Sequence, residues 1–527
     1  MRRNLDQVRS QGPELDNGKT LGLVLIEHFI FGIPYPPKIP LVREPVGARR
    51  FSIRTRLAFY IDCQNLFRDA YDNYLKKGKP VVIPGIGFRH EVLMPPETIS
   101  WVMAQPENEL DPAAAFVEID QVKWALGHDR YVSDAWHGLL VRTDLNRVLE
   151  NVCAALNNEL GVAFDKFFGT DTENWKELDL LETVRMVVAQ AASRFTLGLP
   201  LCRNEEYLRL PVEIVDRLVV NAGATGGAPR LLRPFIGTAV NWTLHSKVER
   251  LKTLFAPVWK ERLASLEATR DDPNYIEPQD HLQRMFHYAE KNRPEELTLD
   301  SMARRLISIN FGTMHQTSFQ VTNMLLNIIG SDAEFNTIAT LRDEGRRVLE
   351  NGSDSQWTKA KVAQMVKSDS VARETLRLHS FAGRAVMRKV MVDGYKTPDG
   401  YSLPKGTITS FLGQAAQTDV NSIDDALKFD PFRFSRLREE AASKGEHAPV
   451  SLVATGPEYL PFGHGKHACP GRFLIDFELK MIIAYVLGHY DVEFPPEYNN
   501  QRPANYWVAE AVFPPKDARI RVKRRAS

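Results

Sequence analysis

The sequence predicts a mainly α-helical protein with a minor antiparallel β-sheet. Apolar residues recur at intervals of three and four over residues 143–168, 177–194, 301–330 and 472–489, which is the spacing of one helix face. Strand signals concentrate in Arg388–Thr409, where β-branched residues are interrupted by two Asp-Gly turns and a Pro-Lys-Gly turn. We therefore expect long helices to build the core and a small sheet to lie beside them.

Length and composition are those of one large enzyme fold or of several smaller domains. The chain has 527 residues, of which 43% are hydrophobic and 25% charged, so a sizeable buried core is available. The formal net charge of +1 argues against a nucleic-acid-binding protein, because that function requires a concentrated basic surface. No repeat or low-complexity tract interrupts residues 51–527, and we expect them to form a single domain.

The N-terminal region contains an apolar run that is too short to span a membrane. Leu21–Ile33 is interrupted by Glu27 and His28, whereas a spanning helix needs roughly 20 apolar residues. No small-residue cleavage site of a signal peptide follows it. Residues 1–33 are therefore an amphipathic helix, a segment that contacts a membrane surface, or the remnant of a membrane anchor. Residues 34–50 contain PYPPKIP, and because proline cannot continue a helix we expect a stiff hinge there.

The four cysteines lie far apart in the sequence and form no CxxC motif. This pattern is typical of a reduced intracellular protein in which each cysteine is a small buried hydrophobic residue. Cys469 stands apart because it lies in the stretch PFGHGKHACPG, residues 461–471. Gly463 and Gly465 allow this stretch to curl tightly, and Pro470 suits the first turn of the helix that the apolar pattern predicts from Arg472 onward.

A cysteine at that place has an unusual environment. The macrodipole and free N–H groups of a helix N-terminus favour a thiolate at Cys469 over a thiol. A thiolate in a glycine-rich loop is either a nucleophile, with His464 or His467 as its base, or a metal ligand. One cysteine is too few for a structural zinc site, whereas haem iron takes a single axial thiolate.

This stretch resembles the haem-binding loop of the cytochrome P450 superfamily. Phe462, Gly465, His467, Cys469 and Gly471 match the pattern F-x-x-G-x-[R/H]-x-C-x-G. The resemblance implies that haem b (iron protoporphyrin IX) is the cofactor and that Cys469 is the axial ligand of its iron. It further implies that Phe462 packs beside the cysteine and that His467 meets a haem propionate. The alternative is a tight turn with a buried cysteine before a helix.

A second motif lies upstream of this loop. In VARETLRLHS, Glu374 and Arg377 are three residues apart, so opposite charges meet on one helix face. Alone, this pattern is typical of an exposed ion pair that adds little stability. The cytochrome P450 family carries such an E-x-x-R pair and joins to it an arginine from a later segment, here FDPFRFSRLRE, where Arg433 fits. The resemblance implies that these three residues form a network that supports the cysteine loop.

Weaker similarities extend the resemblance toward the N-terminus. GLLVRTDL resembles the family's C-helix region, in which a basic residue, here Arg142, either meets a propionate or is a solvated helix residue. GLPLCRNEEYL and WTKAKVAQMVKSDSVARE resemble segments of fungal members that make secondary metabolites. The resemblance thus covers nearly the whole chain after the proline-rich hinge.

The helix that faces dioxygen in this family departs from the usual pattern. The family usually shows [A/G]-G-x-[D/E]-T-[T/S], whose acid and alcohol relay protons to dioxygen, and GTMHQTS is the matching stretch. Gly312 keeps the small residue, His315 replaces the acid, and Gln316 replaces the alcohol. Histidine relays protons near neutral pH, whereas glutamine holds a water but transfers protons poorly. Thr317 takes the place of the alcohol if the helix bulges by one residue. The alternative for each is a polar side chain bonded inside the helix.

The resemblance implies a haem-thiolate monooxygenase that inserts one oxygen atom into a lipophilic small molecule. Its electrons come from NADPH through NADPH-cytochrome P450 reductase, and Lys466 with nearby basic residues are candidate docking contacts. The expected location is the cytosolic face of the endoplasmic reticulum, with peripheral membrane contact and no full span. The expected pocket lining is residues 101–117, 311–318 and Phe381–Val386. Two alternatives remain: a haem-thiolate enzyme for oxidative coupling or isomerisation without oxygen insertion, and a haem sensor without turnover.

Overall fold

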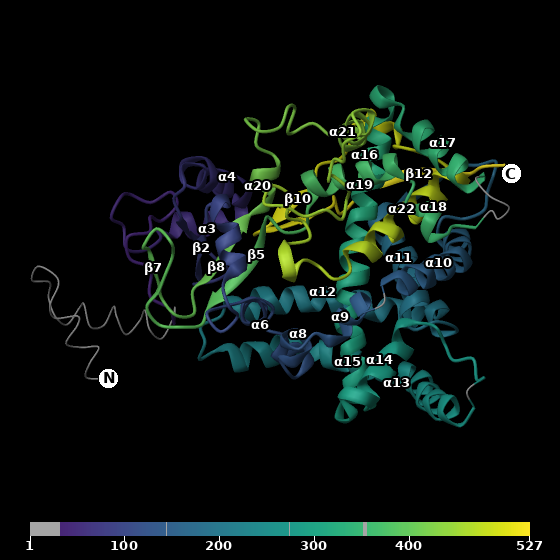
Figure 1. Cartoon of the computed structure of the whole chain (residues 1–527), viewed down its shortest axis with the longest axis horizontal. Coiled ribbons are helices and arrows are strands. Elements are labelled where there is room, and N and C mark those ends of the chain that lie inside the picture. The colour runs from purple at the N-terminus through teal and green to yellow at the C-terminus, as the bar shows by residue number, and fades with distance from the viewer. Residues whose placement is uncertain (1–31, 144, 273, 351–355, 527) are drawn as a thin grey trace, which may run out of the picture.

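The computed structural model describes residues 32–143, 145–272, 274–350 and 356–526. The apolar N-terminal segment, residues 1–33, lies almost entirely outside the described residues. The described chain is mainly α-helical with small sheets, as predicted. Figure 1 shows the sheet-containing part beside α3 (Ile53–Ile61) and the long helices gathered at the other end of the molecule.

The helices before the haem-loop sequence fall into three groups. Short helices come first along the chain: α3, α4 (Cys63–Asn73), α5 (Ile99–Ala104), α6 (Pro112–Asp120), α7 (Val122–Leu126), α8 (Arg130–Ser133) and α9 (Trp136–Thr143). Long helices follow: α10 (Leu145–Phe167), α11 (Leu180–Thr196), α12 (Glu205–Gly227), α13 (Arg233–Asp271), α14 (His281–Asn292), α15 (Leu299–Asn310) and α16 (Gln316–Phe335). The third group is α17 (Thr337–Glu350), α18 (Lys359–Val362), α19 (Val366–His379), α20 (Gly413–Gln417) and α21 (Arg433–Ser443), with α22 (Arg472–His489) after the loop.

The strands of the described residues form four small sheets. One has the order β1-β2-β8-β5-β3, and the others are β10-β11, β4-β12-β9 and β6-β7. Their bounds are β1 (Val81–Pro84), β2 (His90–Leu93), β3 (Leu110–Asp111), β4 (Lys176–Asp179), β5 (Arg384–Val390), β6 (Tyr395–Lys396), β7 (Ser402–Leu403), β8 (Ile408–Leu412), β9 (Tyr490–Glu493), β10 (Tyr506–Val508), β11 (Ala511–Phe513) and β12 (Arg519–Arg524).

The sheet predicted over residues 388–409 is present but is larger and mixed. β5 pairs antiparallel with β8, and β6 pairs antiparallel with β7, as expected. β8 also pairs in parallel with β2, with Val92 opposite Thr409 and Leu93 opposite Ser410. The purely antiparallel sheet is therefore corrected to a mixed one. Local turn signals predict hairpins, whereas this parallel pairing joins two segments that lie far apart in the sequence.

Capping residues begin several of the long helices. Asp179 accepts a hydrogen bond from the backbone N–H of Glu182 at 3.0 Å and thereby starts α11. Thr298 accepts from the backbone N–H of Ser301 at 3.2 Å and starts α15. Such caps satisfy N–H groups that have no partner within the helix.

The predicted helix over residues 301–330 is broken in the middle. α15 passes into a π-helical segment, Phe311–His315, before α16 continues in the same direction. α16 is buried on almost all sides, among α11, α17, α19 and α22. A π segment inserts one extra residue and often marks a functional site. The sequence GTMHQTS therefore lies across a bulge in the central helix of the molecule.

The proline-rich segment packs on the sheet. Leu41 bridges to Val82 of β1, and the backbone N–H of Val42 donates to the Val82 carbonyl at 3.0 Å. Ile39, Leu41 and Val42 are buried in the core that the sheet shares with α3 and α4. The described part of this segment is thus held against the globular body.

Candidate active site

The cysteine loop is closed by its own backbone. The Cys469 N–H donates to the Phe462 carbonyl at 2.8 Å, and α22 begins three residues later at Arg472. Gly463 and Gly465 have φ values of 65° and 67°, in the left-handed region that favours glycine. A Cβ at Gly465 would lie 2.6 Å from Cε of Met103, so this glycine also makes room for a neighbouring side chain. The predicted tight loop before a helix is confirmed.

Burial and hydrogen-bond donors act in opposite directions on the Cys469 thiol. Burial raises the pKa of its thiol. The backbone N–H groups of Gly471 and Arg472 point at the sulfur, and the guanidinium groups of Arg472 and Arg142 lie near it, and all of these lower the pKa. Burial outweighs them in the protein without its cofactor, while the N–H groups at the start of α22 act in the predicted direction. A bound metal cation deprotonates a ligating thiol, which supplies the missing stabilisation.

Two of the predicted propionate partners lie at this loop. Arg142, in α9, donates to the carbonyls of Lys466 and Ala468 at 3.4 Å each, and so clamps the turn before the cysteine. His467 lies 3.3 Å from Oε1 of Glu107, and its pKa is lowered by burial and by the charges of Arg388 and Arg142. Arg142 therefore brings a positive charge to the loop, and His467 lies beside it.

Arg388 is a further cation of this group that the sequence analysis missed. It lies on β5 and is buried, yet it makes no ion pair with any carboxylate of the described residues. Its hydrogen bonds go to the Met387 carbonyl at 2.8 Å and to Sδ of Met103 at 3.3 Å. Burial lowers its pKa, and the more distant Glu107 and Asp111 only partly offset this. A buried guanidinium without a carboxylate calls for an anion.

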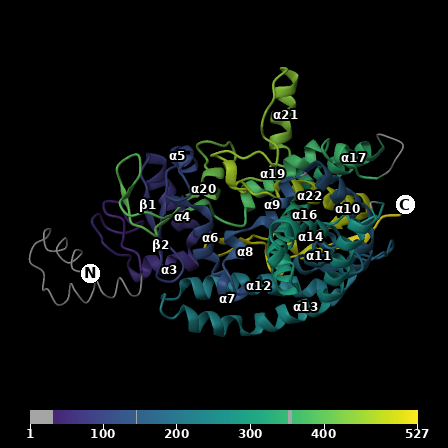
Figure 2. The same cartoon turned by 60° about the horizontal axis from the view of Figure 1, so that its bottom comes forward.

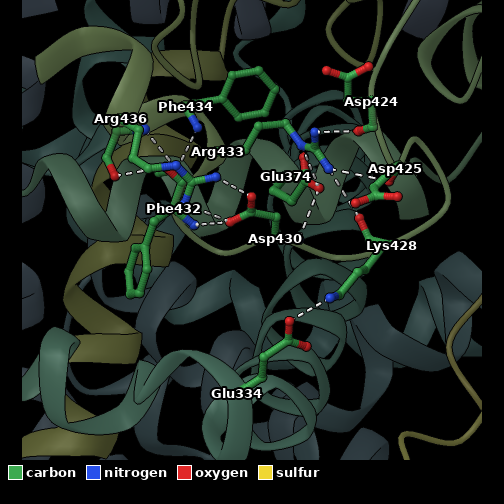
Figure 3. A network of polar contacts seen from close by, with 12 residues as sticks. Glu334, Glu374, Asp424, Asp425, Lys428, Asp430, Phe432, Arg433, Phe434 and Arg436 are labelled. Atoms are coloured by element: carbon green, nitrogen blue, oxygen red, sulfur yellow. Dashed lines mark hydrogen bonds and ion pairs between the residues drawn. The ribbon is translucent and has the colours of Figure 1, made fainter. Parts of the chain in front are cut away.

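Glu374, Arg377 and Arg433 meet as the resemblance implied (Figure 3). Nε and Nη2 of Arg377 donate to the two oxygens of Glu374, each at 2.7 Å. Nε of Arg433 donates to Oε1 of Glu374 at 3.2 Å, as does the backbone N–H of Asp430. Glu374 and Arg377 are fully buried, so the pair is not an exposed ion pair.

The other N–H groups of the two arginines donate to backbone carbonyls from the end of α20 to the start of α21. Arg377 donates from Nη1 to the carbonyls of Gln417, at 2.8 Å, and Ala426, at 2.6 Å. Arg433 donates to the carbonyl of Asp424 at 2.8 Å (Figure 3). One buried carboxylate therefore fixes a long irregular stretch of backbone. The chain then continues toward the cysteine loop.

Arg373, one turn before Arg377, is another supporting residue that the sequence analysis missed. Its guanidinium lies 3.7 Å from the ring centroid of Tyr459 and donates to the Ala454 carbonyl at 3.1 Å. Cation–π contacts of this kind are strong when buried. Because residues 454–459 lead directly into the loop, α19 holds the cysteine from a second side.

The π segment of the central helix leaves Gly312 exposed. Gly312 is exposed although it lies in the middle of a buried helix, and a Cβ added there would meet no atom within 4 Å. Gln316, the first residue of α16, is half-buried, and its side chain forms no hydrogen bond within the described residues. Thr317 is fully buried, and its hydroxyl likewise lacks a partner within that part of the chain. The bulge on which the role of Thr317 depended is present.

His315 lies on another side of this helix. Its ring packs against Phe319 and Phe381, with centroid distances of 4.3 and 5.7 Å. Nε2 lies 3.6 Å from Oδ1 of Asp216 in α12. Burial, followed by the charge of Arg185, lowers the pKa of His315 to about 4. The ring is therefore neutral at neutral pH, and any proton transfer through it passes between its two nitrogens.

The residues of this region fit a haem. Cys469 offers one sulfur in a tight loop, which matches a single axial ligand. Arg388 carries a buried positive charge without a carboxylate, which matches an anionic propionate. The open space beside Gly312 leaves room along the central helix. Within the described residues, no group of three or more acidic, histidine or cysteine side chains is placed to hold a metal ion.

Comparisons with known proteins identify the family. A family model described as "Cytochrome P450" matches residues 141–522. The chain is 52% identical over 506 residues to "Cytochrome P450 monooxygenase pbrC" of Penicillium brasilianum, covering 95% of this chain and 94% of that protein. It is 52% identical over 510 residues to "Cytochrome P450 monooxygenase astC" of Aspergillus terreus, covering 95% of both chains. It is 44% identical over 499 residues to "Cytochrome P450 monooxygenase tenB" of Beauveria bassiana, covering 93% of both.

The family match spans well over half of the chain and includes α19, the segment that carries Arg433 and the cysteine loop. The relatives align over nearly the full length at high identity. The chain therefore belongs to the cytochrome P450 family and is a haem-thiolate monooxygenase.

Proposed function

We propose that this enzyme uses electrons from NADPH, delivered by a reductase, to insert one oxygen atom of dioxygen into a lipophilic small molecule of fungal secondary metabolism. The observation that carries the proposal is the loop Phe462–Gly471, which holds the Cys469 sulfur against the N–H groups of Gly471 and Arg472. Haem b, when bound, supplies the reduction and cleavage of dioxygen. The fungal relatives named as cytochrome P450 monooxygenases support the same reaction class.

The proposed cofactor contacts follow from the geometry of the loop. Cys469 ligates the iron, and Phe462, whose carbonyl accepts from the Cys469 N–H, packs beside it. Gly465 and Gly471 keep the loop free of side chains that would obstruct the approach of the cofactor. Arg142 and Arg388, as cations, and His467, as a hydrogen-bond donor, hold the propionates.

The proposed catalytic residues lie on the central helix. Gln316 lies four residues after the exposed Gly312 and therefore on the same side of the helix. It is less buried than His315 and Thr317, so its side chain holds a water on the Gly312 side. Thr317 offers a buried hydroxyl without a protein partner in the described residues. His315 passes protons between its ring nitrogens. Together they deliver protons while the helix excludes bulk water.

The substrate surface is proposed to be aromatic. Phe381 packs on Phe319 and on Phe513 of β11, with centroid distances of 5.8 Å in both cases. Tyr506 of β10 stacks on Phe513 at 5.5 Å. Rings from the segment after α19 and from the β10-β11 hairpin thus meet beside the central helix. Such a surface favours a lipophilic molecule.

The test is a reconstitution of the haem-loaded enzyme with NADPH and a cytochrome P450 reductase under isotope-labelled dioxygen. Candidate lipophilic metabolites are first selected by their perturbation of the haem spectrum. A product that gains one labelled oxygen supports the proposal. A product that loses two hydrogens per new bond indicates oxidative coupling, and a product of unchanged mass indicates isomerisation. If candidates bind but do not stimulate NADPH consumption, the protein would instead be a haem sensor.

We place the reductase contact on the surface around Lys466. This side chain is 57% exposed and lies three residues before Cys469, while Arg142 beside it is also exposed. Exposed cations steer an acidic partner and make association salt-dependent. Lys466→Glu should slow the reduction of the haem by the reductase. The matched control is Lys444→Glu, a 56% exposed lysine that directly follows α21, the helix that projects from the body (Figure 2).

We further propose that the catalytic domain, residues 51–527, touches the cytosolic face of the endoplasmic reticulum membrane. No helix of the described residues combines the length and apolar composition needed to cross a bilayer. Ile53, Leu57 and Ile61 are nevertheless exposed at intervals of four on one face of α3. An exposed apolar stripe of this kind marks an interaction surface.

Neighbouring segments extend this stripe. Arg56 of α3 donates to the Gly87 carbonyl at 3.2 Å, which places the β1-β2 turn, with exposed Phe88, against α3. Gly87 in turn lies directly on Gly227 at the end of α12, just before exposed Leu231. Figure 2 shows α3, α12 and α13 along the same side of the molecule. The apolar segment before residue 34 enters the described chain at Gly32, beside Arg230.

Vesicle flotation tests this membrane proposal. The full chain should float with neutral phosphatidylcholine vesicles, and Ile53→Glu combined with Phe235→Glu should weaken the association. Phe235 is exposed at the start of α13. Leu437→Glu, an exposed apolar position on α21, is the control. Equal flotation of the double variant and the control would contradict this surface.

A further inference from the structure

We propose that Asp216 of α12 is a positioning residue that sets the ring orientation and tautomer of His315 and connects it to solvent. This inference rests on the proposed role of His315 in proton delivery. Asp216 lies outside the motif that singled out His315, and 99 residues separate them in the sequence.

The contact joins a buried ring to an accessible carboxylate. The His315 side chain is 3% exposed and that of Asp216 is 44% exposed, with Nε2 and Oδ1 3.6 Å apart. This distance exceeds a hydrogen bond, and a water or a small side-chain movement closes it. Asp216 is therefore placed to exchange protons with solvent on one side and with the ring on the other.

Arg185 of α11 fixes the carboxylate in place. Its Nη1 and Nη2 donate to Oδ2 and Oδ1 of Asp216, each at 3.2 Å. This two-point contact restricts the rotation of the carboxylate. Nη1 of Arg185 also donates to Oε1 of Glu182 at 3.2 Å, so Arg185 retains a carboxylate partner if Asp216 is replaced.

Few other charges face His315. Arg185 acts on the ring from α11 and Asp216 from α12. Glu182 pairs with Arg185, and Tyr506 of β10 has a pKa that responds to both Arg185 and Asp216. Glu213, one turn before Asp216, interacts with it more weakly through space and pairs with Lys247 of α13. The aromatic rings that pack on His315 within the described residues are those of Phe311, Phe319 and Phe381.

The chemistry follows from the two ring nitrogens. A neutral imidazole carries its proton on one nitrogen and accepts at the other. With Nε2–H directed at the Asp216 carboxylate, Nδ1 becomes the acceptor, and Nδ1 is buried without a partner within the described residues. Proton delivery starts from the other tautomer: Nδ1 releases its proton while Nε2 takes the proton of the Asp216 carboxyl, which leaves the Nε2–H ring beside an Asp216 carboxylate that solvent reprotonates.

Burial shifts the pKa values of the two groups toward each other. Burial raises the pKa of Asp216 above its usual value, and burial lowers the pKa of His315 to about 4. Proton exchange is easiest between groups of similar pKa. The environment therefore reduces the difference in pKa that separates a carboxyl group from an imidazole in water.

The first test is NMR of isotope-labelled histidine in the haem-loaded enzyme, in its diamagnetic ferrous carbon-monoxide form. His315→Phe assigns the His315 resonances. We expect the Nε2–H tautomer in the unmodified enzyme, a shift toward the Nδ1–H tautomer in Asp216→Ala, and restoration in Asp216→Glu. Glu213→Ala, on the same helix, should leave the tautomer unchanged. An unchanged tautomer in Asp216→Ala would overturn the proposal.

The second test is the partition of NADPH electrons between product and peroxide across pH. Asp216→Ala should lower the product share about tenfold and alter its pH profile, whereas Asp216→Glu and Glu213→Ala should behave like the unmodified enzyme. The proposal would also be overturned if Asp216→Ala showed the same product share and the same pH profile as the unmodified enzyme. Failure of the monooxygenase proposal looks different, because the unmodified enzyme would then incorporate no labelled oxygen.

Discussion

Nε of Arg433 lies 3.2 Å from Oε1 of Glu374, although 59 residues separate them in the sequence. Arg377 occupies both oxygens of the same carboxylate at 2.7 Å. Glu374 therefore ties α19 to the segment that precedes the cysteine loop (Figure 3). A buried network of this kind adds little net stability compared with apolar side chains, but loss of one member leaves an unpaired buried charge.

Glu374→Ala or Arg433→Ala should accordingly destabilise the enzyme by about 3–5 kcal/mol. We expect poorly folded, haem-free protein rather than an active enzyme with a raised KM. Haem content per protein and chemical denaturation measure this. The matched control is Glu334→Ala, which removes an exposed ion pair with Lys428 in the same region (Figure 3). Normal haem content and turnover in both network variants would show that the network is dispensable.

Arg388→Gln should weaken haem binding, because it removes the buried positive charge that has no carboxylate partner among the described residues. A charge-assisted hydrogen bond contributes about 1.5–3 kcal/mol, so the haem dissociation constant should rise about 10- to 100-fold. Transfer of haem to apomyoglobin measures its release. Lys396→Gln, at an exposed position of β6, is the control. Equal haem loss from both variants would contradict a role for Arg388 at the cofactor.

Gln316→Ala should divert NADPH electrons from product to peroxide if the amide holds the proton-carrying water. Positioned acid–base groups contribute about 10²–10⁴-fold, so the effect should be large. If the Thr317 hydroxyl is the donor instead, Thr317→Val should uncouple the reaction and Gln316→Ala should be mild. Peroxide and product are quantified together for both variants and for His315→Phe. Full coupling in all three would exclude proton delivery by these side chains and favour the coupling or isomerisation chemistry.

Acid should destabilise the fold through its buried histidines. Burial lowers the pKa of His90, His281 and His315 to about 4, compared with about 6.5 in the unfolded chain. Between these values the unfolded state binds more protons, so the free energy of unfolding falls as the pH falls. Between pH 7 and pH 5, each of these histidines should lower the free energy of unfolding by about 2 kcal/mol.

His315→Phe should remove its share of this acid sensitivity. Denaturation at pH 7 and pH 5 should show a smaller difference in unfolding free energy for this variant than for the unmodified protein. His447→Gln, at an exposed position after α21, should leave the difference unchanged. An acid sensitivity identical in both variants would show that His315 is not protonated on unfolding.

Local patterns in the sequence predicted the parts of the fold that depend on local chemistry. Helical periodicity located α10, α11 and α22, and the glycine-rich loop before Arg472 was expected from its residues. The family resemblance assembled Glu374 with Arg433, which spacing alone could not do. The open alternative for Thr317 depended on a helix bulge, and the π segment Phe311–His315 provides it.

The remaining features depend on contacts between distant segments. The parallel pairing of β2 with β8, the cation–π contact of Arg373 with Tyr459 and the approach of Asp216 to His315 each join residues that share no motif. Arg388 left only a weak signal, a basic residue within a predicted strand. The balance between burial and N–H donors at Cys469 required the packed structure, because the helix terminus and burial act in opposite directions.

The most direct test of the account is the spectrum of the reduced, carbon-monoxide-bound enzyme. Iron ligated by the Cys469 thiolate should give the red-shifted Soret band that is characteristic of thiolate ligation, and Cys469→Ser should abolish it. Cys153→Ser is the control, because Cys153 is buried in α10 and should leave the band intact. An unchanged red-shifted band in Cys469→Ser would contradict the assignment of Cys469 as the iron ligand.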